Sequence, residues 1–308
     1  MRSDPLISIV VPVLNQVKYL GEALRSLVEQ DYSALEVIIQ DGESNDGSAA
    51  VAEEMVRRNP EAFRLFVEKD LHLSDALNRG FARAKGEILG YLSADDLLLP
   101  RSLHRVAAEV APDRGRHVVM GRSVYLVEGM GDIGVAHPAE YLGLFDHLAI
   151  WKRGFNAVPQ PSVFWHRSVQ ERVGAFAADE PYAVDYDLVC RMGRYYEIHN
   201  VDCAWSACRI HGGRASARRT DSEMVDTWIG VSRRYWGSWL SPLRWQCEAS
   251  YWLYNRHLHE HARHHARLAE NAAVDGHPLV AQLEFLKTWI YSPAMARGRY
   301  RRGLDRKS

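Results

Sequence analysis

Short apolar runs alternate with amphipathic stretches in the first part of the chain, and this alternation constrains the fold more than any other feature. The apolar runs are residues 6–13, 35–39, 63–67 and 88–92. Short runs of this kind, bounded by turn residues, are typical of strands buried in a parallel sheet, and the stretches between them have helical periodicity. Strands and helices in alternation predict βαβ units with right-handed crossovers. The sequence therefore predicts an α/β fold, with a doubly wound and mostly parallel sheet flanked by helices.

Polar side chains follow three of the predicted strands. Asn15 comes after the first strand, Asp41 after the second, and Asp95 and Asp96 after the fourth. The carboxyl ends of parallel strands meet at one edge of a sheet, where open α/β sheets bind ligands. Two neighbouring carboxylates repel each other unless a cation or a ligand lies between them, which favours a site. The alternative is that one of them caps the helix predicted after Pro100.

Two common phosphate-binding loops are missing from the sequence. No G-x-G-x-x-G follows the first strand, and no G-x-x-x-x-G-K-[ST] occurs anywhere. This disfavours a dinucleotide-binding Rossmann domain and a P-loop NTPase, because both hold phosphate with a glycine-rich loop. Side chains and a cation are therefore expected to hold the ligand.

Charge, cysteine spacing and hydrophobicity indicate the setting of the protein. A net charge of −1 argues against a dedicated nucleic-acid-binding protein. The cysteines lack the paired spacing of a zinc site, which favours free thiols in a reducing compartment. No secretory signal follows Met1, and no stretch is apolar enough to span a bilayer. We therefore expect a cytoplasmic protein without a nucleic-acid partner.

Five segments, in this order, resemble family 2 glycosyltransferases, which are inverting enzymes of GT-A fold that use nucleotide-activated sugars. They read Val-Pro-Val-Leu-Asn (11–15), Asp-Gly-Glu-Ser-Asn-Asp-Gly (41–47), Leu-Ser-Asp-Ala-Leu-Asn-Arg-Gly (73–80), Ala-Lys-Gly (84–86) and Leu-Ser-Ala-Asp-Asp (92–96). Each is short, but their order and spacing make the resemblance specific. It implies a GT-A domain with a Rossmann-like sheet, and it reappears in pieces to about His211.

The resemblance also implies which residues bind the donor, a nucleotide-diphosphate sugar. Pro12, Val13 and Asn15 would line the nucleotide pocket, and Asp41 would accept a hydrogen bond from the base. The other residues implied near the nucleotide or the sugar are Ser44, Asp75, Asn78, Ser93 and Ala94.

A divalent cation, Mn²⁺ or Mg²⁺, is implied as cofactor. Asp95 would be the metal-binding acid of the family's D-x-D motif, although Ser93 stands where the family has its first acid. A hard cation held by a carboxylate neutralises the charge that develops on a diphosphate leaving group. In relatives, a histidine at the position of His211 approaches the metal or diphosphate, and Arg214 would grip phosphate. The alternative for His211 is a solvated histidine in a surface turn.

The second half of the chain is expected to bind the acceptor. Residues 156–173 resemble the Gln-Pro-Ser-x-Phe segment of polysaccharide-assembling members of the family. Val163 and Phe164 are expected to belong to a core strand, and Trp165 could be part of it as well. The candidates for acceptor or sugar contacts are Asp96, Gln160, Trp165, His166 and Arg214.

Asp185 occupies the place of the family's catalytic base. Inversion by single displacement needs one carboxylate to take the proton of the attacking hydroxyl. Asp187 is the rival, and both acids suit the start of the helix predicted here. Val184 precedes Asp185, so the acidic pair seen in relatives is incomplete. We predict Asp185 as the base.

Two parts of different character make up the chain. Residues 1–220 are predicted to form the catalytic domain, with a nucleotide-binding half (1–100) and an acceptor half (101–220). Residues 221–308 are predicted to form a helical extension rich in aromatic residues and arginine. Its tryptophans and basic tail could contact an anionic membrane surface, which would make the protein peripheral at the inner face of the plasma membrane. The alternative is a solvated tail.

The function expected from these features is transfer of a sugar to an acceptor hydroxyl with inversion, in polysaccharide or lipopolysaccharide assembly. The partners would be the nucleotide-sugar and a glycan or lipid-linked acceptor. One alternative is a non-catalytic module that binds sugar nucleotides or glycans, which Ser93 and Val184 keep open. A sugar nucleotidyltransferase is a weaker alternative, because it should have a phosphate loop rich in glycine and arginine after the first strand.

Overall fold

The computed structural model divides the chain into two compact units, Met1–Trp236 and Gly237–Ser308. It describes residues 4–127, 131–137, 140–178, 182–212, 221–254 and 268–269. The first unit extends past the predicted boundary at residue 220 and includes helix α8 (Asp221–Arg233). The Ser232 hydroxyl, near the end of α8, donates a hydrogen bond of 2.6 Å to the Leu148 carbonyl. This contact ties α8 to the rest of the first unit.

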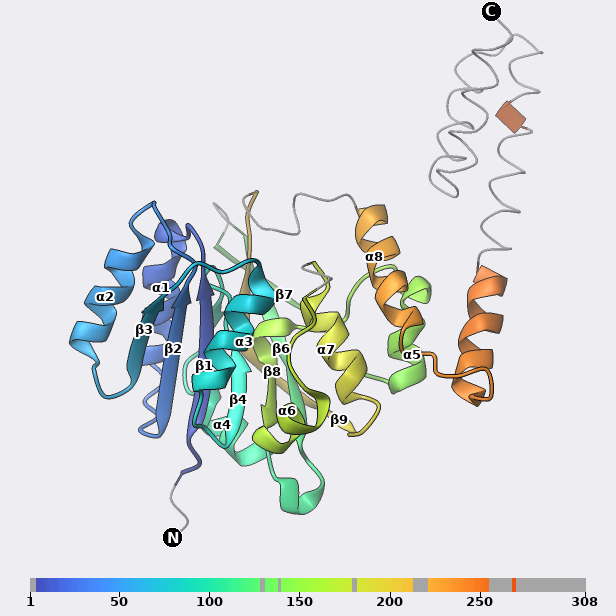
Figure 1. Cartoon of the computed structure of the whole chain (residues 1–308), viewed down its shortest axis with the longest axis horizontal. Coiled ribbons are helices and arrows are strands. Elements are labelled where there is room, and N and C mark those ends of the chain that lie inside the picture. The colour runs from blue at the N-terminus through green and yellow to red at the C-terminus, as the bar shows by residue number, and fades with distance from the viewer. Residues whose placement is uncertain are drawn as a thin grey trace, which may run out of the picture. The chain divides into compact units, whose positions relative to one another are not determined.

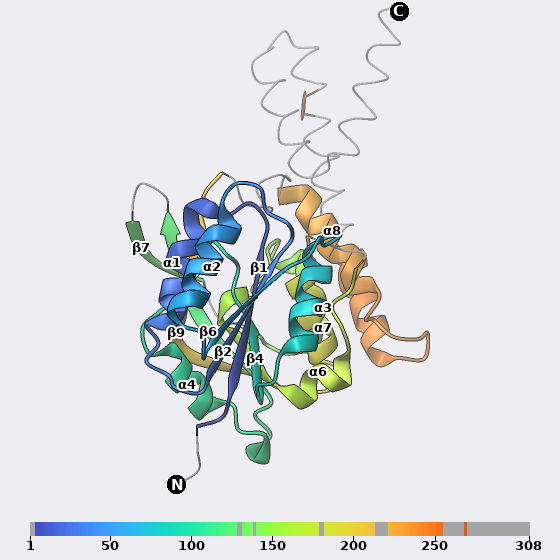
Figure 2. The ribbon, with the colours of Figure 1, turned by 60° about the vertical axis from the view of Figure 1, so that its left-hand side comes forward.

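Four parallel strands form the first half of the sheet, as the alternation predicts. They lie side by side in the order β3-β2-β1-β4. Helices α1 and α2 cover one face of these strands and α3 covers the other (Figure 1, Figure 2). The elements are β1 (Ile7–Val13), α1 (Val17–Val28), β2 (Leu35–Asp41), α2 (Ser48–Arg58), β3 (Phe63–Val67), α3 (Leu73–Arg83) and β4 (Ile88–Tyr91).

The second half of the sheet is mixed, a feature that the sequence did not predict. Beyond β4 the order continues β8-β6-β9-β5, and β7 pairs with β6. Strand β8 runs antiparallel to both β4 and β6, and β5 runs antiparallel to β9. The bounds are β5 (Leu97–Leu98), β6 (Val118–Val127), β7 (Gly131–His137), β8 (Val163–His166) and β9 (Ile198–Ile210). The result is an α/β fold whose parallel half adjoins a mixed half.

Short helices complete the first unit. They are α4 (Ser102–Glu109), α5 (Leu144–Leu148), α6 (Arg167–Val173) and α7 (Val184–Met192), with the 3₁₀ turns η1 (Pro112–Arg114), η2 (Ile150–Lys152) and η3 (Gln160–Ser162). Among the described residues, no helix combines the length and the apolar character needed to cross a bilayer.

Two apolar clusters, one on each face of the sheet, form the core. Ile9 and Val11 of β1 face Leu20 and Leu24 of α1 on one side. Val10, between them in the strand, belongs to the other cluster, together with residues of α3 and α7. Successive side chains of a strand point to opposite faces, so a strand buried on both faces is apolar along its whole length. This explains why the first strand has no alternating pattern.

Gly86 lies where the chain enters β4 and where a side chain has no room. A Cβ added there would stand 2.5 Å from the Ser8 backbone nitrogen and 2.8 Å from the Leu6 carbonyl oxygen. The Gly86 N–H also donates to the Ser8 hydroxyl at 2.7 Å. Because the obstructing atoms are backbone atoms of the central strand, they have little freedom to move. Glycine at this position therefore permits the close approach of β1 and β4.

We expect Gly86→Ala to lower the free energy of unfolding by about 2 kcal/mol or more, since it forces β1 and β4 apart. Gly230→Ala is the control, because Gly230 lies in α8 with no atom within 4 Å of its added Cβ. That helical change should be neutral or stabilising by up to about 1 kcal/mol. Urea denaturation followed by circular dichroism measures both. Equal stability of the two variants would contradict the close approach.

Candidate active site

The loops after β1 and β2 bind each other at the carboxyl edge of the sheet. The Asn15 N–H donates to the Ser44 hydroxyl at 2.9 Å, and the Asn15 side-chain oxygen accepts from the Asn45 N–H at 2.9 Å. Asn15 has a positive φ of 54°, a conformation that asparagine tolerates better than most residues. The Ser44 N–H in turn donates to Asp41 Oδ1 at 2.7 Å. Asn15, Asp41 and Ser44 thus form one connected rim, as predicted.

The first turns of α1 and α2 continue this rim. The Gln16 N–H donates to the Ser48 hydroxyl at 2.8 Å, and the Val17 N–H donates to Asp46 Oδ2 at 2.9 Å. Although burial acts to raise the pKa of Asp46, hydrogen bonds from Ser48 and Val17 lower it overall. Asp46 therefore stays ionised, and it holds the start of α1 against the start of α2.

One carboxylate oxygen of Asp41 is buried without a hydrogen-bond donor among the described residues. The residue is fully buried, and its Oδ2 accepts no hydrogen bond from the residues that the structure describes. A buried acceptor without a donor costs free energy, so such an atom marks a place where a partner is missing. Pro12 and Val13 lie buried in β1 beside it, and the Val13 carbonyl accepts from the Gly42 N–H at 2.9 Å. The donor that suits Asp41 Oδ2 is an N–H group.

The polar side-chain groups of Asp75 and Asn78, on α3, form hydrogen bonds with other residues of the protein. Asp75 pairs with Arg79 at 2.9 Å and accepts from the Leu71 N–H at 3.1 Å. Asn78 donates to the Phe176 carbonyl at 3.0 Å and accepts from the Phe176 N–H at 2.7 Å. Both polar ends of the Asn78 side chain therefore bind the loop before α7. In this way Asn78 holds that loop against α3.

The turn after β4 carries Ser93, Ala94, Asp95 and Asp96. The Ser93 hydroxyl donates to the Gln160 side-chain oxygen at 3.1 Å, and the Gln160 amide donates to the Tyr91 carbonyl at 2.8 Å. Ala94 is buried beneath the turn. Gln160, predicted as an acceptor residue, thus braces this turn with both ends of its side chain.

Asp95 and His211 meet although they are far apart in the sequence. His211 Nε2 lies 3.0 Å from Asp95 Oδ2, and the imidazole lies 4.5 Å from the Tyr19 ring. His211 follows β9, and β9 pairs with β5, which begins directly after Asp96. The geometry agrees with the prediction that these two residues form one site, and a solvated histidine in a surface turn does not describe His211, whose side chain is only 4% exposed.

The Asp95–His211 pair suits a cation that brings further ligands with it. A carboxylate oxygen and an imidazole nitrogen are donors that Mn²⁺ accepts. Within the described parts of the chain, no three His, Cys, Asp or Glu residues gather closely enough to hold a metal ion. A cation here would therefore complete its coordination with oxygens of water and of a bound diphosphate.

Asp96 is buried and bound to β9. It is 2% exposed, and its Oδ1 accepts from the Arg209 N–H at 2.9 Å. Helix α4 has Arg101 as its N-cap residue and receives no side-chain cap hydrogen bond from it. Neither Asp95 nor Asp96 caps α4 in the contacts of this turn. The structure therefore does not support the capping alternative.

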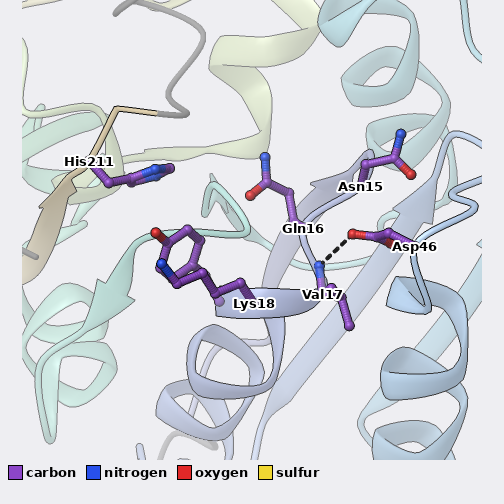
Figure 3. A pocket seen from close by; sticks show the side chains of 7 residues that line it. Asn15, Gln16, Val17, Lys18, Asp46 and His211 are labelled. Atoms are coloured by element: carbon purple, nitrogen blue, oxygen red, sulfur yellow. Dashed lines mark hydrogen bonds between the residues drawn. The ribbon is translucent and has the colours of Figure 1, made fainter.

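A pocket of about 350 Å³ opens beside the Asp95–His211 pair. Its lining consists of Asn15, Gln16, Val17, Lys18, Tyr19, Asp46 and His211. Figure 3 shows His211 approaching the start of α1 from the end of β9, across the pocket from Asn15 and Asp46. The pocket thus joins the rim formed by the first two loops to the predicted metal ligands.

Asp185 and Asp187 have different roles in α7. Asp187 is 1% exposed, pairs with Arg191 at 3.0 Å and accepts a hydrogen bond from the Tyr235 hydroxyl. Asp185 is only partly buried and accepts from the Asn156 amide at 2.9 Å. A base must reach a substrate, and Asp187 is enclosed by an ion pair and a tyrosine. The geometry therefore favours Asp185 over its rival.

Tyr91, at the end of β4, has a pKa that is raised in part by the charges of two acids. Burial raises the pKa of Tyr91 well above its ordinary value, and the negative charges of Asp185 and Asp96 raise it further. Both carboxylates therefore lie near the same tyrosine.

Trp165 and His166 do not fit their predicted roles at the acceptor. Trp165 is fully buried and packs on Phe81, so it has no surface to offer a sugar ring. His166 pairs in register with Ile88, at the start of β4 and hence at the opposite end of that strand from Asp95. Its Nδ1 lies 2.8 Å from the Ser168 hydroxyl at the start of α6. Val163 and Phe164 are buried core residues, as predicted.

Other predicted positions lie outside the described residues. They are Arg214, Trp289 and the basic tail.

Three residues of this region were missed by the sequence reasoning. Arg209 contacts both acids of the turn after β4, Tyr235 contacts Asp187, and Asn156 contacts Asp185. Arg209 stands two positions before His211. The prediction of His211 as a site residue could therefore have pointed to Arg209 as well. Tyr235 and Asn156 are separated from their partners by at least one helix, and no local pattern identifies them.

We expect Asp187→Asn to destabilise the protein by about 3 kcal/mol, because it leaves the buried Arg191 without its carboxylate. Asp185→Asn should cost less than about 1 kcal/mol, since an amide oxygen can still accept from Asn156. Thermal and urea denaturation of both variants measure the difference. A similar loss in both would contradict the distinction between a structural acid and an accessible one.

Comparisons with known proteins agree with this geometry. A family model described as glycosyl transferase family 2 matches residues 8–164, about half of the chain. An uncharacterized glycosyltransferase of Rickettsia felis is 26% identical over 228 residues, which cover 70% of this chain and 36% of that protein. A Nostoc protein also described as an uncharacterized glycosyltransferase is 32% identical over 100 residues. The chain spans only about a third of the length of these curated relatives.

Solved structures share the fold at low sequence identity. The mannosyltransferase PcManGT from Pyrobaculum calidifontis, solved with GDP-Man and Mn²⁺, has a TM-score of 0.61 and 18% identity, covering 98% of this chain and 80% of that one. S. aureus TarS 1–349, solved with UDP-GlcNAc, has a TM-score of 0.57 and 15% identity, covering 92% and 91%. These similarities confirm the predicted GT-A type of α/β fold. Together with the family model, which covers half of the chain, they mean that this chain belongs to glycosyl transferase family 2.

Proposed function

We propose that the protein is an inverting glycosyltransferase that moves a sugar from a nucleotide-diphosphate sugar to an acceptor hydroxyl. The observation that carries the proposal is the meeting of Asp95 and His211 at 3.0 Å, together with a partly buried carboxylate, Asp185, that is held by Asn156. A cation site for the leaving group and a carboxylate for the attacking hydroxyl are the two groups that this reaction needs. Family membership and the two ligand-bound neighbours support it.

The donor would bind along the rim formed by the loops after β1 and β2. Asp41 Oδ2, which is buried without a hydrogen-bond donor, would accept an N–H of the base. Asn15 and Ser44 would line the nucleotide beside it, above Pro12 and Val13. The diphosphate would extend towards the pocket between α1 and His211.

A divalent cation, Mn²⁺ or Mg²⁺, held by Asp95 and His211 would neutralise the negative charge of the departing diphosphate. Ser93 is bound to Gln160 and would support the turn, where other family members have an acid. Asn78 would act one step further away, by holding α3 to the loop before α7. Asp75 would hold the start of α3 through Leu71 and Arg79.

Asp185 would act as the general base. Its free electron pair takes the proton of the acceptor hydroxyl while the hydroxyl oxygen forms a bond to the anomeric carbon. The bond from that carbon to the diphosphate oxygen breaks on the opposite face, so the configuration inverts. Asn156 donates to Asp185 Oδ2 and the Tyr186 N–H donates to Asp185 Oδ1, and both hydrogen bonds orient the carboxylate. The acceptor would be a glycan or a lipid-linked sugar, in polysaccharide or lipopolysaccharide assembly.

A non-catalytic module that binds sugar nucleotides is the second candidate. The hydroxyl of Ser93 in place of an acid and Val184 before Asp185 favour it. It would bind the donor and lack turnover, so the base variant separates the two candidates.

We expect Asp185→Asn to reduce transfer at least about 10²-fold, because the base contributes that much to the rate. Binding of the nucleotide-sugar should stay within about twofold. A screen of UDP- and GDP-sugars by thermal shift finds the donor first, and product formation and calorimetry then measure the two effects. Full activity in the variant would refute the assignment of Asp185, and a wild-type protein that binds a donor without any turnover would favour the non-catalytic module.

We also expect Asp95→Asn to abolish the part of the nucleotide-induced thermal stabilisation that depends on Mn²⁺. A ligand that binds only the folded state raises the melting temperature by mass action, so the increment reports affinity. The comparison uses UDP and GDP, each with Mn²⁺ and with EDTA. Wild-type stabilisation that is unchanged by EDTA would refute the cation site.

Contact with an anionic membrane surface, at the inner face of the plasma membrane, is a further part of the proposal. Residues 242–254 form a helix of the second unit, and Trp245, Trp252 and Leu253 lie on one face of it, each more than half exposed. Trp239 and Leu240, just before the helix, are also exposed. Exposed tryptophans beside basic residues are typical of helices that lie in a membrane interface. Residues 237–308 contain eleven Lys and Arg against six Asp and Glu.

We expect the double variant Trp252→Gln, Leu253→Gln to weaken vesicle binding about tenfold, since each large apolar side chain that enters the interface contributes on the order of 1 kcal/mol. Leu142→Gln, Phe155→Gln removes two exposed apolar residues of the first unit and serves as control. Co-sedimentation with phosphatidylglycerol–phosphatidylcholine vesicles, against phosphatidylcholine alone, measures it. Equal binding of both double variants would refute this contact.

A further inference from the structure

Arg209 contacts the turn after β4 with its backbone and its side chain, and helix α1 with its side chain. Its backbone N–H donates to Asp96 Oδ1 at 2.9 Å, and its Nε donates to the Asp95 carbonyl at 3.0 Å. Its Nη2 donates to Glu22 Oε2 at 2.6 Å, on helix α1. The guanidinium also lies 5.0 Å from the centre of the Tyr19 ring. Arg209 is 9% exposed, so solvent screens its contacts with the turn only weakly, whereas the Glu22 side chain is 50% exposed and its ion pair is screened more.

These contacts join three segments that are distant in the sequence: α1, the turn after β4 and the end of β9. Asp95 belongs to the second segment and His211 to the third, so their 3.0 Å approach depends on how the segments are held. Arg209 grips the backbone of Asp95 and stands two residues before His211. Tyr19, of the first segment, contacts both the guanidinium and the imidazole.

We propose that Glu22, Arg209 and Asp96 form a clasp that positions Asp95 and His211 to hold a divalent cation. This rests on the cation site of the proposed function. Arg209 and Glu22 are positioning residues, which act through Asp95 and His211. Asp96 acts in the same way, through the N–H of Arg209, instead of contacting the acceptor.

The clasp is distinct from the contacts that hold the sheet together here. Leu97 and Leu98 of β5 pair with Ala207 and Ser206 of β9, and the Leu99 N–H donates to the Trp205 carbonyl at 2.8 Å. These backbone bonds lie further from the site and do not involve the Arg209 side chain. Loss of the clasp should therefore leave the strand pairing in place and loosen only the approach of His211 to Asp95.

The geometry of the guanidinium predicts that lysine is a poor substitute. Nε and Nη2 donate in different directions, to the turn and to α1, and one ammonium nitrogen at the end of a flexible chain does not reproduce this fork. Asparagine at position 96, in contrast, keeps a carbonyl oxygen that can accept the Arg209 N–H. The two substitutions therefore test the clasp without removing a cation ligand.

The experiment measures Mn²⁺ binding to the full chain by electron paramagnetic resonance, with Mn²⁺ alone as the probe. We expect Arg209→Lys and Asp96→Ala to weaken binding about tenfold, the size of effect known for residues that orient metal ligands. Asp96→Asn should bind within about threefold of wild type. Arg153→Lys is the matched control, because Arg153 is a half-buried arginine paired with Asp146, away from the turn.

The outcomes separate the clasp from the proposed function. Loss of Mn²⁺ binding in Asp95→Asn, with unchanged binding in Arg209→Lys and Asp96→Ala, overturns the clasp and leaves the cation site. Equal losses in Asp96→Asn and Asp96→Ala also overturn it, since Asp96 would then contact the cation itself. A wild-type protein that binds no Mn²⁺, either alone or together with UDP or GDP, overturns both. In the double variant Arg209→Lys, His211→Ala, the losses should be less than additive, because both act on one pair.

Discussion

The parallel pairing of β1 with β2 on one side and with β4 on the other is the constraint on which the site depends. Parallel strands end at the same edge, so Asn15, Asp41 and Asp95 are brought to one rim by backbone hydrogen bonds alone. The loops then bind one another directly, through Asn15 and Ser44. Gly86 allows this arrangement, because a side chain there would meet the backbone of β1. The arrangement of the site residues at this edge therefore depends on the pairing of three strands.

The mixed half of the sheet supplies what the parallel half lacks. Strand β9 pairs with the short β5, and this brings His211 to Asp95 from the other end of the first unit. Arg209 stands at the centre of this junction, with contacts to the turn and to α1. Helix α7 supplies Asp185, which Asn156 holds by a hydrogen bond of 2.9 Å. The site thus collects single residues from segments that have no common local pattern.

Burial decided most of the corrections to the expected site. Trp165 was a reasonable acceptor residue because tryptophan stacks on sugars, yet it lies at the centre of an apolar cluster. Asp185 and Asp187 stand two residues apart and look equivalent in a sequence. Tyr235, just after α8, and Arg191, one turn after Asp187, enclose Asp187 and do not enclose Asp185. Likewise, the Gln160 side chain binds the Tyr91 carbonyl and the Ser93 hydroxyl, and the Asn78 side chain binds the backbone of Phe176.

The sequence by itself determined the parallel strands, the helices between them and the polar residues at the strand ends, because periodicity and turn chemistry are local properties. It therefore predicted the rim of Asn15, Asp41 and Asp95. Only the tertiary structure decided the mixed order of the remaining strands, the meeting of His211 with Asp95 and the burial of Trp165. These depend on which distant segments pack together, and that choice is made by the total burial of apolar surface and by hydrogen bonds between segments.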